Sequence, residues 1–346
     1  MANPRRQFLK VSALAGGVAA TGGLAASEAS AAKAAKEADG LDTSRLANPE
    51  MVQGVTILNY EEGGRIYLGV KTSKGILQVN KAAKAFKMPA PNSTDDVIQG
   101  GDQGLTKLVN LALSKGSPNL FIDESKVQFA PAVVNPQKIV CVGLNYAKHA
   151  AETKSPLPTM PILFNKFNNT LNSHNGVVKV SKINASNFDY EAELVIVMGR
   201  RASNVSEADA LKYVFGYATG NDFTARELQR RSSQWMIGKT LDGSGLVGPY
   251  IVSADLVGNP NELKIEQYVN GEVRQSSNTN DMVFNCAQIV SYTSKIFTLE
   301  PGDIIYTGTP EGVILGYPED KRVWLKAGDK LETRIEKLGN LKFSLV

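Results

Sequence analysis

Three acidic residues occupy alternate positions in the stretch FDYEAELVIVMG, residues 188–199: Asp189, Glu191 and Glu193. If this stretch is a β-strand, alternate side chains point to one face, so the carboxylates share a face with Val195 and Val197. The opposite face is apolar and is expected to be core. A solvated strand end is the alternative interpretation of an isolated E-x-E pair. Because both faces turn apolar directly afterwards, we expect the acids at the edge of a buried region.

Buried carboxylates need a cationic partner or must take up protons. No basic residue occurs in this strand before Arg200, so a metal ion is a natural partner. An all-oxygen site suits Mg²⁺, Mn²⁺ or Ca²⁺. Asp222 is a candidate third ligand, because in GYATGNDFTARELQRR it ends a β-like run and precedes a helical one. The alternative for Asp222 is a helix N-cap.

A second pair with chemical potential is His149 and Glu152 in NYAKHAAE. The two residues are three apart, so in a helical turn they share one face. His149 is one of only two histidines in the chain, and the other, His174, matches no recognised motif. A single helical histidine is more often a hydrogen-bonded surface or core group than a catalytic one, and the spacing alone leaves both interpretations open.

The elements that must position these residues lie within residues 131–346, after a smaller N-terminal region. Residues 51–130 predict a small α+β domain, with short strands in VTILNY, RIYLGV and GILQVN and one helix near residues 106–116. Pro131 and Pro136 mark the expected boundary. Residues 131–346 contain many short β-rich runs, a hairpin signal at Asn270-Gly271, and helical patterns at 206–215, 224–233 and 286–297.

This irregular mixture predicts an α+β fold that is mostly β, with peripheral helices. It excludes the regular alternation of a TIM barrel or a doubly wound sheet. A G-x-G-x-x-G match at residues 243–248 is not a dinucleotide site, because Pro249 and a β-like run follow it where that motif requires a helix.

Composition places the chain among ordinary globular proteins of about two domains, with 346 residues, 42% hydrophobic and 21% charged residues. The formal net charge of +4 predicts no nucleic-acid partner. Cys141 and Cys286 lie in apolar contexts and are expected to be small buried hydrophobic residues, although an oxidising compartment would permit a disulfide.

Residues 1–31 have the features of a signal peptide: a basic start, a short Gly- and Ala-rich apolar run, and the small residues ASA at 29–31. The sequence RRQFLK resembles a twin-arginine signal, which predicts export to the periplasm or secretion. A disordered tail is the alternative. The run is too short and too weakly apolar for a permanent membrane span. Residues 32–50 are expected to be a linker.

Six motifs together resemble the fumarylacetoacetate hydrolase family: GLNYAKHAAE, YEAEL, GYATGNDFTARE, GKTLDGSGLVGP, VNGEVRQ and GDIIYTGTPEGV. They occur in the family's order over about residues 138–346. Residues 51–130 resemble the smaller N-terminal domain that many members carry. The resemblance implies a mixed β-sandwich or roll as the catalytic domain, and a homodimer.

The resemblance also implies roles for individual residues. Glu191, Glu193 and Asp222 would bind Mg²⁺ or Mn²⁺, with Ca²⁺ less expected, and His149 and Glu152 would be a water-activating dyad. Arg226 and Gln229 would bind substrate carboxylate and carbonyl oxygens, and Lys239 would also polarise the reacting group. Tyr146 and Thr309 would lie in the pocket, whereas Arg230 and Arg231 are expected to be solvated.

The implied activity is metal-dependent hydrolysis of a carbon–carbon bond in an acylpyruvate-like 1,3-diketo acid, a small 2-oxo acid. Alternatives within the family are isomerisation or decarboxylation of substrates such as 2-hydroxyhepta-2,4-diene-1,7-dioate, and a ureidoglycolate-type lyase reaction. The alternative outside enzymes is an exported dicarboxylate-binding protein, which the intact dyad disfavours.

Overall fold

The computed structural model describes residues 50–346. The predicted signal peptide, and all but the last residue of the predicted linker, lie outside this range. Within residues 50–346, no helix is long and apolar enough to cross a membrane.

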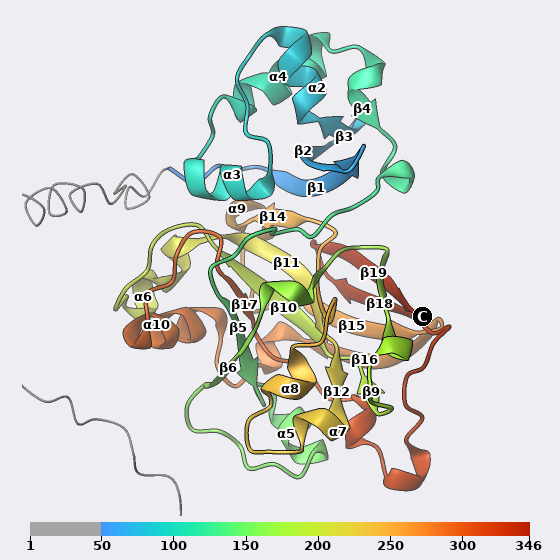
Figure 1. Ribbon diagram of the computed structural model, residues 1–346. Coiled ribbons are helices and arrows are strands. Elements are labelled where there is room, and N and C mark those ends of the chain that lie inside the picture. Colours follow the sequence, from blue (N-terminus) through green and yellow to red (C-terminus); the bar gives the residue numbers. More distant parts are fainter. Residues whose placement is uncertain (1–49) are drawn as a thin grey trace, which may run out of the picture. The chain divides into compact units, whose positions relative to one another are not determined.

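The N-terminal part of the described chain is a small antiparallel sheet with helices beside it (Figure 1). Its elements are β1 (Thr56–Glu62), β2 (Arg65–Thr72), β3 (Gly75–Gln78), β4 (Phe121–Ile122), α2 (Val79–Phe86), α3 (Thr94–Gly100) and α4 (Leu105–Lys115). The predicted strands and the helix near 106–116 are confirmed. Two helices were missed. The helix α2 begins directly after Gln78, the last residue of β3. The helix α3 starts with a capping box, in which Ser93 and Asp96 exchange side-chain-to-backbone hydrogen bonds.

A 12-stranded sheet connects this part to the rest of the described chain. Its main strand order is β4-β3-β2-β1-β14-β11-β10-β17-β5-β6. The additional strands are β5 (Ile139–Gly143), β6 (Ile162–Lys166), β7 (Leu171–Asn172), β10 (Ala192–Met198), β11 (Val214–Asp222), β13 (Gly245–Val247), β14 (Ile251–Ser253) and β17 (Ile304–Tyr306). Because β1 pairs with β14, the sheet runs across the predicted boundary near residue 131. That boundary stays a prediction.

A five-stranded sheet, in the order β16-β15-β18-β19-β8, packs against β10 and β11. Its strands are β8 (Gly176–Val178), β15 (Lys264–Val269), β16 (Glu272–Asn278), β18 (Lys330–Ile335) and β19 (Gly339–Leu345). The predicted hairpin joins β15 to β16, and both turn residues have positive φ, 52° at Asn270 and 87° at Gly271. The predicted α+β fold with mostly β-structure is confirmed.

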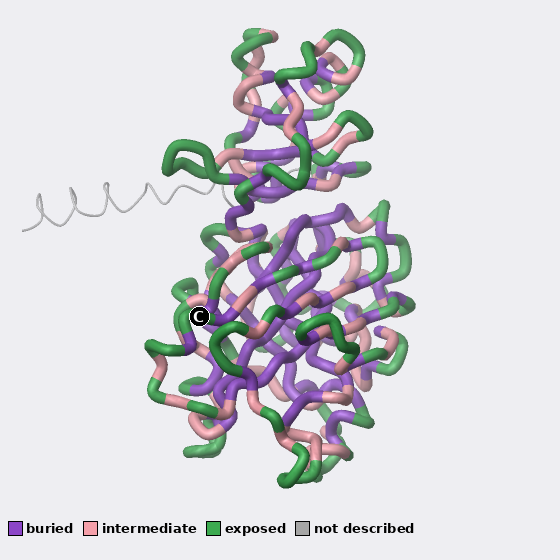
Figure 2. Tube along the Cα trace, turned by 90° about the vertical axis from the view of Figure 1, so that its right-hand side faces the viewer, coloured by how far each residue is buried: buried purple, intermediate pink, exposed green. Residues whose placement is uncertain are grey.

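The two faces of β10 bury different side chains. Leu194, Ile196 and Met198 belong to the core shared with the five-stranded sheet, whereas Val195 and Val197 belong to the core shared with β1, β2 and the N-terminal helices. Figure 2 shows how completely these central strands are buried. One expectation was wrong: the strand is not continuous from Asp189. β9 (Phe188–Asp189) pairs with β12 (Thr224–Ala225), and β10 begins only at Ala192, because Tyr190 enters a third core cluster.

The remaining helices are short: α5 (Ala147–Glu152), α6 (Glu207–Ala210), α7 (Arg226–Gln229), α8 (Met236–Lys239), α9 (Ala254–Val257) and the longer α10 (Cys286–Ile296). The three predicted helical patterns are therefore confirmed, although α6 and α7 are single turns. No helix begins directly after the G-x-G-x-x-G match: β13 lies within the match, and β14 is the next element. Cys141 and Cys286 are both buried and free, as expected.

Candidate active site

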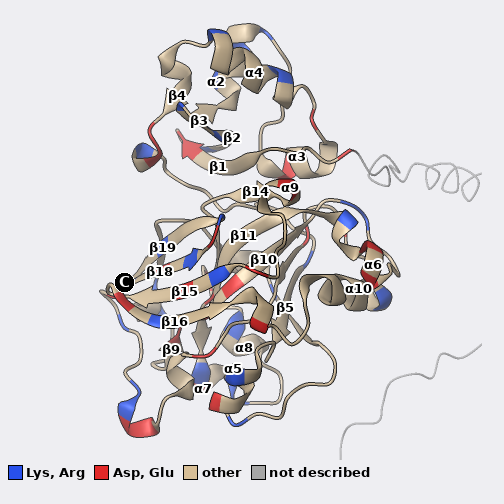
Figure 3. Ribbon diagram, turned by 180° about the vertical axis from the view of Figure 1, so that it is seen from behind, with Lys and Arg blue, Asp and Glu red and all other residues tan. Residues whose placement is uncertain are grey.

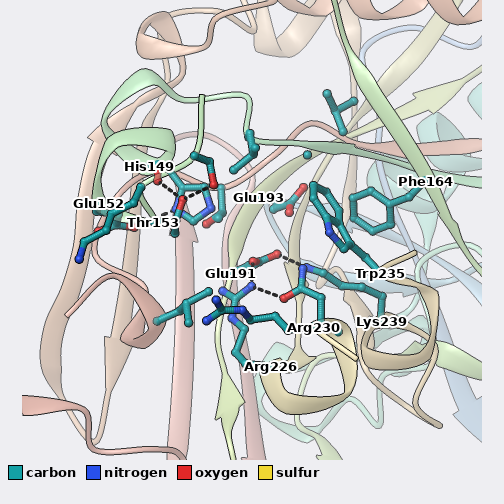
Figure 4. Close-up of a pocket in the computed structure, with 18 of the residues that line it drawn as sticks. His149, Glu152, Thr153, Phe164, Glu191, Glu193, Arg226, Arg230, Trp235 and Lys239 are labelled. Carbon is teal, nitrogen blue, oxygen red and sulfur yellow. Dashed lines mark hydrogen bonds and ion pairs between the residues drawn. The ribbon is translucent and has the colours of Figure 1, made fainter. Parts of the chain in front are cut away.

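A cavity of about 320 Å³ opens among α5, α7, α8 and the start of β10 (Figure 4). These helices carry charged residues of both signs (Figure 3). The predicted site residues that line the cavity are His149, Glu152, Glu191, Glu193, Arg226, Gln229, Lys239 and Thr309. Asp222 lies behind this wall and is fully buried.

Glu191, Glu193 and Asp222 form one buried cluster, in which one carboxylate oxygen from each lies within 4.8 Å of the others. The antiparallel pairing of β10 with β11 explains this convergence. Ala192 lies opposite Asn221, so Glu191 and Asp222 meet where one strand begins and the other ends. The Asp222 N–H donates to the Glu191 carbonyl oxygen at 2.9 Å. The structure thus places the three predicted metal ligands together, and their role as ligands stays a prediction.

Three basic side chains from other elements pair with these acids. Lys239 contacts Glu191 closely and lies 2.9 Å from Asp222 Oδ2. Lys166, on β6, lies 2.6 Å from Asp222 Oδ1. Arg226 NH1 lies 2.7 Å from Glu191 Oε1, and Arg226 Nε lies 2.8 Å from Asp189 Oδ2. The strand itself has no basic residue before Arg200, as the sequence shows, but basic partners reach these acids from elements that are distant in sequence.

Glu193 differs from its neighbours, because within residues 50–346 it forms no ion pair with a basic side chain. Its Oε2 accepts a hydrogen bond from the Gly308 N–H at 2.6 Å. Burial, with the charges of Asp222 and Glu191, raises the pKa of Glu193 well above its usual range. Burial would also raise the pKa of Glu191, but Lys239 and Arg226 outweigh this effect and lower it to about 2.

This arrangement fits a divalent cation. The cluster offers only carboxylate oxygens, the ligand type that Mg²⁺ and Mn²⁺ prefer. Glu193 supplies a buried carboxylate that has no cation of its own. The four buried acids, Asp189, Glu191, Glu193 and Asp222, outnumber the three buried bases, Lys166, Arg226 and Lys239.

His149 and Glu152 form the predicted pair on α5. His149 Nδ1 lies 2.8 Å from Glu152 Oε1, and Glu152 Oε2 accepts a hydrogen bond from the Gly312 N–H at 2.8 Å. Because an ionised carboxylate can only accept, the hydrogen of a neutral imidazole lies on Nδ1, and Nε2 keeps its lone pair. His149 is 5% exposed and lines the cavity, so the pair is suited to move a proton there.

The predicted substrate-binding residues differ in their surroundings. Arg226 NH1 donates to Gln229 Oε1 at 3.0 Å, while Arg226 NH2 is buried and has no hydrogen-bond partner in the described chain. Thr309 Oγ1 accepts from Gln275 Nε2 at 2.8 Å. Tyr146 differs from the expectation: it does not line the cavity, and its side chain is buried in the core, where its hydroxyl has no hydrogen-bond partner among residues 50–346.

Sequence reasoning missed several residues of this region. Lys166 gave no signal, because its contact with Asp222 spans 56 positions. Gln275 was inside the VNGEVRQ motif but was not singled out. Its Oε1 accepts the Ala192 N–H at 3.0 Å, and its Nε2 also donates to the Pro310 carbonyl at 2.8 Å. Gln275 thus ties the strand of Glu193 to the loop that carries Thr309. Arg230 is exposed, as expected, but the sequence did not indicate that it also lines the cavity.

Comparison with known proteins shows which family the chain belongs to. Residues 138–346 match the family described as Fumarylacetoacetate (FAA) hydrolase C-terminal. The fumarylacetoacetate hydrolase domain-containing protein 2 homolog of Dictyostelium discoideum is 42% identical over 247 residues, covering 68% of this chain and 79% of that protein. Oxaloacetate tautomerase YisK of Bacillus subtilis (strain 168) is 37% identical over 288 residues, covering 80% of this chain and 95% of YisK.

Among solved structures, maleylpyruvate hydrolase from Sphingobium sp. SYK-6, in complex with manganese(II) ion and pyruvate, is similar with a TM-score of 0.66. The identity is 28%, and the match covers 84% of this chain and 98% of that chain. The family match, the two relatives and the shared fold lead to one conclusion: the chain belongs to the fumarylacetoacetate hydrolase family of enzymes.

Proposed function

We propose that the protein is a metal-dependent keto–enol tautomerase of a small 2-oxo acid, with oxaloacetate as its first test substrate. The observation that carries this proposal is that one cavity joins a proton-transfer pair, His149 and Glu152, to a buried cluster of metal-binding character. The similarity to a relative named oxaloacetate tautomerase, over most of the length of both chains, supports the choice of reaction.

Glu191, Glu193 and Asp222 are the residues that would hold Mg²⁺ or Mn²⁺. Such an ion withdraws electron density from substrate oxygens, which makes an adjacent C–H group more acidic. Arg226 lines the cavity, and its Nη2 has no hydrogen-bond partner within residues 50–346, so this atom is the proposed donor to a substrate carboxylate. Gln229 holds the guanidinium by accepting from Nη1. Lys239 is buried between Glu191 and Asp222, so its ammonium keeps these carboxylates at a fixed separation.

His149 is the proposed proton carrier. Its Nε2 accepts the proton of the carbon next to the 2-oxo group and returns a proton to the 2-oxo oxygen, or acts in the reverse direction. A C–H bond is thereby exchanged for an O–H bond, and no group or water is gained or lost. Glu152 stabilises the imidazolium that forms in between and fixes the orientation of the ring.

Hydrolysis of an acylpyruvate, the reaction predicted from the sequence motifs, is the second candidate. The observation that favours it is the same dyad, because a base of this kind can also take a proton from water. The similar fold of a maleylpyruvate hydrolase supports it. Hydrolysis requires a water molecule and releases pyruvate, whereas tautomerisation does neither, so the two reactions are separable in one experiment.

The experiment follows the ultraviolet absorbance of the oxaloacetate enol with purified protein in the presence of Mg²⁺, Mn²⁺ or excess chelator. Pyruvate release from acetylpyruvate and fumarylpyruvate is measured in parallel. His149→Gln is the catalytic control, and Arg231→Gln is the matched control because Arg231 is exposed and does not line the cavity.

We expect metal-dependent interconversion of the oxaloacetate tautomers above the rate with metal alone, lost in His149→Gln and kept in Arg231→Gln. Pyruvate release from the acylpyruvates, without tautomer interconversion, would replace the first candidate with the second. If the protein catalysed neither reaction with any of the metals, both candidate functions would be contradicted.

Export and dimer formation also remain proposals. The export signal lies in residues 1–31, outside the described residues. Fractionation of cells that express the full chain tests export, and light scattering of the purified protein tests dimer formation.

A further inference from the structure

The mouth of the cavity carries basic side chains that the proposed reaction does not use. Lys154, Arg230 and Arg322 all line the cavity, as does Glu319, whose side chain is 91% exposed. Their charge is therefore not balanced locally, in contrast to the buried bases at the inner end.

Arg230 is directed to the mouth by the helix that also holds Arg226. The Arg230 N–H donates to the Arg226 carbonyl oxygen at 3.0 Å, so the two residues are one helical turn apart. Side chains four positions apart in such a turn lie on the same face, about 6 Å apart along the axis. Figure 4 shows both guanidinium groups at the cavity. Arg226 is buried, Arg230 is exposed, and the Arg230 side chain forms no ion pair within residues 50–346.

Arg322 reaches the same cavity from the end of the 3-10 helix η9 (Glu319–Lys321), which it directly follows. Its Nε donates to the Tyr317 carbonyl oxygen at 2.9 Å, which fixes the guanidinium. Its NH1 lies 3.8 Å from Glu319 Oε1, and the Glu319 side chain is 91% exposed. An exposed pair at this distance contributes little, so the end of the Arg322 side chain is free to bind an anion.

The cavity therefore has two separate sets of donors without strong partners: Arg226 NH2 at the inner end, and the guanidinium groups of Arg230 and Arg322 at the mouth. Arginine binds carboxylates through paired hydrogen bonds, which makes a carboxylate the best-matched group for each set.

We propose that Arg230 and Arg322 bind a second carboxylate of the substrate, remote from its 2-oxo acid end, and so make the enzyme selective for 2-oxo dicarboxylates. This inference deepens the proposed function and rests on it for the orientation of the substrate. Arg230 and Arg322 are specificity-determining residues in this account, and they take no part in proton transfer.

The test compares two five-carbon acids that differ only at the remote end, 2-oxoglutarate with a carboxylate and 2-oxopentanoate with a methyl group. Their binding to the Mg²⁺-loaded protein is measured by titration calorimetry for the wild type, the double variant Arg230→Gln/Arg322→Gln, and Arg231→Gln. Arg231 is the matched control, an exposed arginine next in sequence that does not line the cavity.

We expect the wild type and Arg231→Gln to bind 2-oxoglutarate about tenfold more tightly than 2-oxopentanoate, as one good charge-assisted contact allows. The double variant should lose this preference while its affinity for 2-oxopentanoate stays the same. The proposal would be overturned if the wild type bound the two acids equally or did not bind 2-oxoglutarate. It would also be overturned if the preference survived in the double variant or was lost in Arg231→Gln.

Tautomerisation of oxaloacetate is measured on the same samples. If oxaloacetate is tautomerised but 2-oxoglutarate is not preferred over 2-oxopentanoate, only the proposed second-carboxylate site is overturned. The binding preference without turnover leaves that site standing and removes the tautomerase assignment.

Discussion

At the inner end of the cavity, Lys239 and Arg226 are buried against carboxylates, whereas at its mouth Arg230 and Arg322 are exposed or partly exposed and have weak partners or none. The inner charges are held by β10, β11 and the helix turns that follow them, and the outer ones by a helix end and a loop. The difference indicates two tasks: the inner charges maintain one another in a fixed arrangement, and the outer charges are available to a substrate.

The largest effect expected from this comparison is on stability. Lys166 and Lys212 each lie 2.6 Å from an aspartate, but the Lys166–Asp222 pair is fully buried and the Lys212–Asp209 pair is on the surface. Lys166→Met should lower the free energy of unfolding by about 3–5 kcal/mol, because it leaves a buried carboxylate without that partner. Lys212→Met should change it little. Chemical denaturation of both variants measures the difference, and equal effects would contradict the assigned roles.

The inner end is also held by neutral hydrogen bonds. Gln275→Leu leaves the buried Ala192 N–H without its acceptor and Thr309 without its donor. We expect a loss of about 1–3 kcal/mol in unfolding free energy. We also expect weaker metal binding, because Ala192 lies between Glu191 and Glu193. Unchanged metal affinity in a folded variant would show that Gln275 serves stability alone.

A smaller effect of opposite sign is expected at Glu193. In protein stripped of metal by a chelator, Glu193→Gln should raise the free energy of unfolding by on the order of 1 kcal/mol, because burial disfavours the charge and the amide oxygen can still accept from Gly308. Glu191→Gln should lower it instead, because Lys239 and Arg226 lose a charge partner.

The pH dependence provides the check on Glu193. A carboxyl group whose pKa is raised on folding costs stability as pH rises from its unfolded pKa, about 4.3, through its folded pKa. The advantage of Glu193→Gln over the wild type should therefore grow as pH increases across that interval. An advantage that shrinks with pH would mean that Glu193 has a cationic partner.

The least change is expected from the cysteines. Burial raises the pKa of the Cys286 thiol to about 12 and that of the Cys141 thiol well above its usual range. Neither thiol should react with a thiol reagent in the native protein at pH 8, and both should react after unfolding in guanidinium. Rapid reaction of either in the native state would show that the core around it opens.

Local patterns in the sequence were enough to predict much of the inner end. Alternation placed Glu191 and Glu193 near each other, a strand end placed Asp222, and helical spacing paired His149 with Glu152. Each of these signals acts over a few residues. The break at Tyr190 was not visible, because it depends on Phe188 and Asp189 pairing with a strand more than 30 positions away.

Arg226 and Lys239 were named through the family resemblance, but two other residues around the acids could not be predicted, for the same reason. Lys166 and Gln275 reach the site through β6 and β16, whose neighbours are set by the packing of the two sheets. Arg230 and Arg231 are both exposed, as expected, but two consecutive arginines in a sequence do not show which one lines a cavity. The helix turn that begins at Arg226 places Arg230 one turn later, on the same side as Arg226.

We expect Glu191, Glu193 and Asp222 to bind one divalent cation beside the His149–Glu152 pair. A Mn²⁺ titration of the metal-free protein tests this directly, with the free ion measured by its electron paramagnetic resonance signal. The wild type should take up about one ion per chain, as expected for a buried all-carboxylate cluster, and Glu193→Gln should take up none. Absence of binding in the wild type, or equal binding by Glu193→Gln, would contradict the claim.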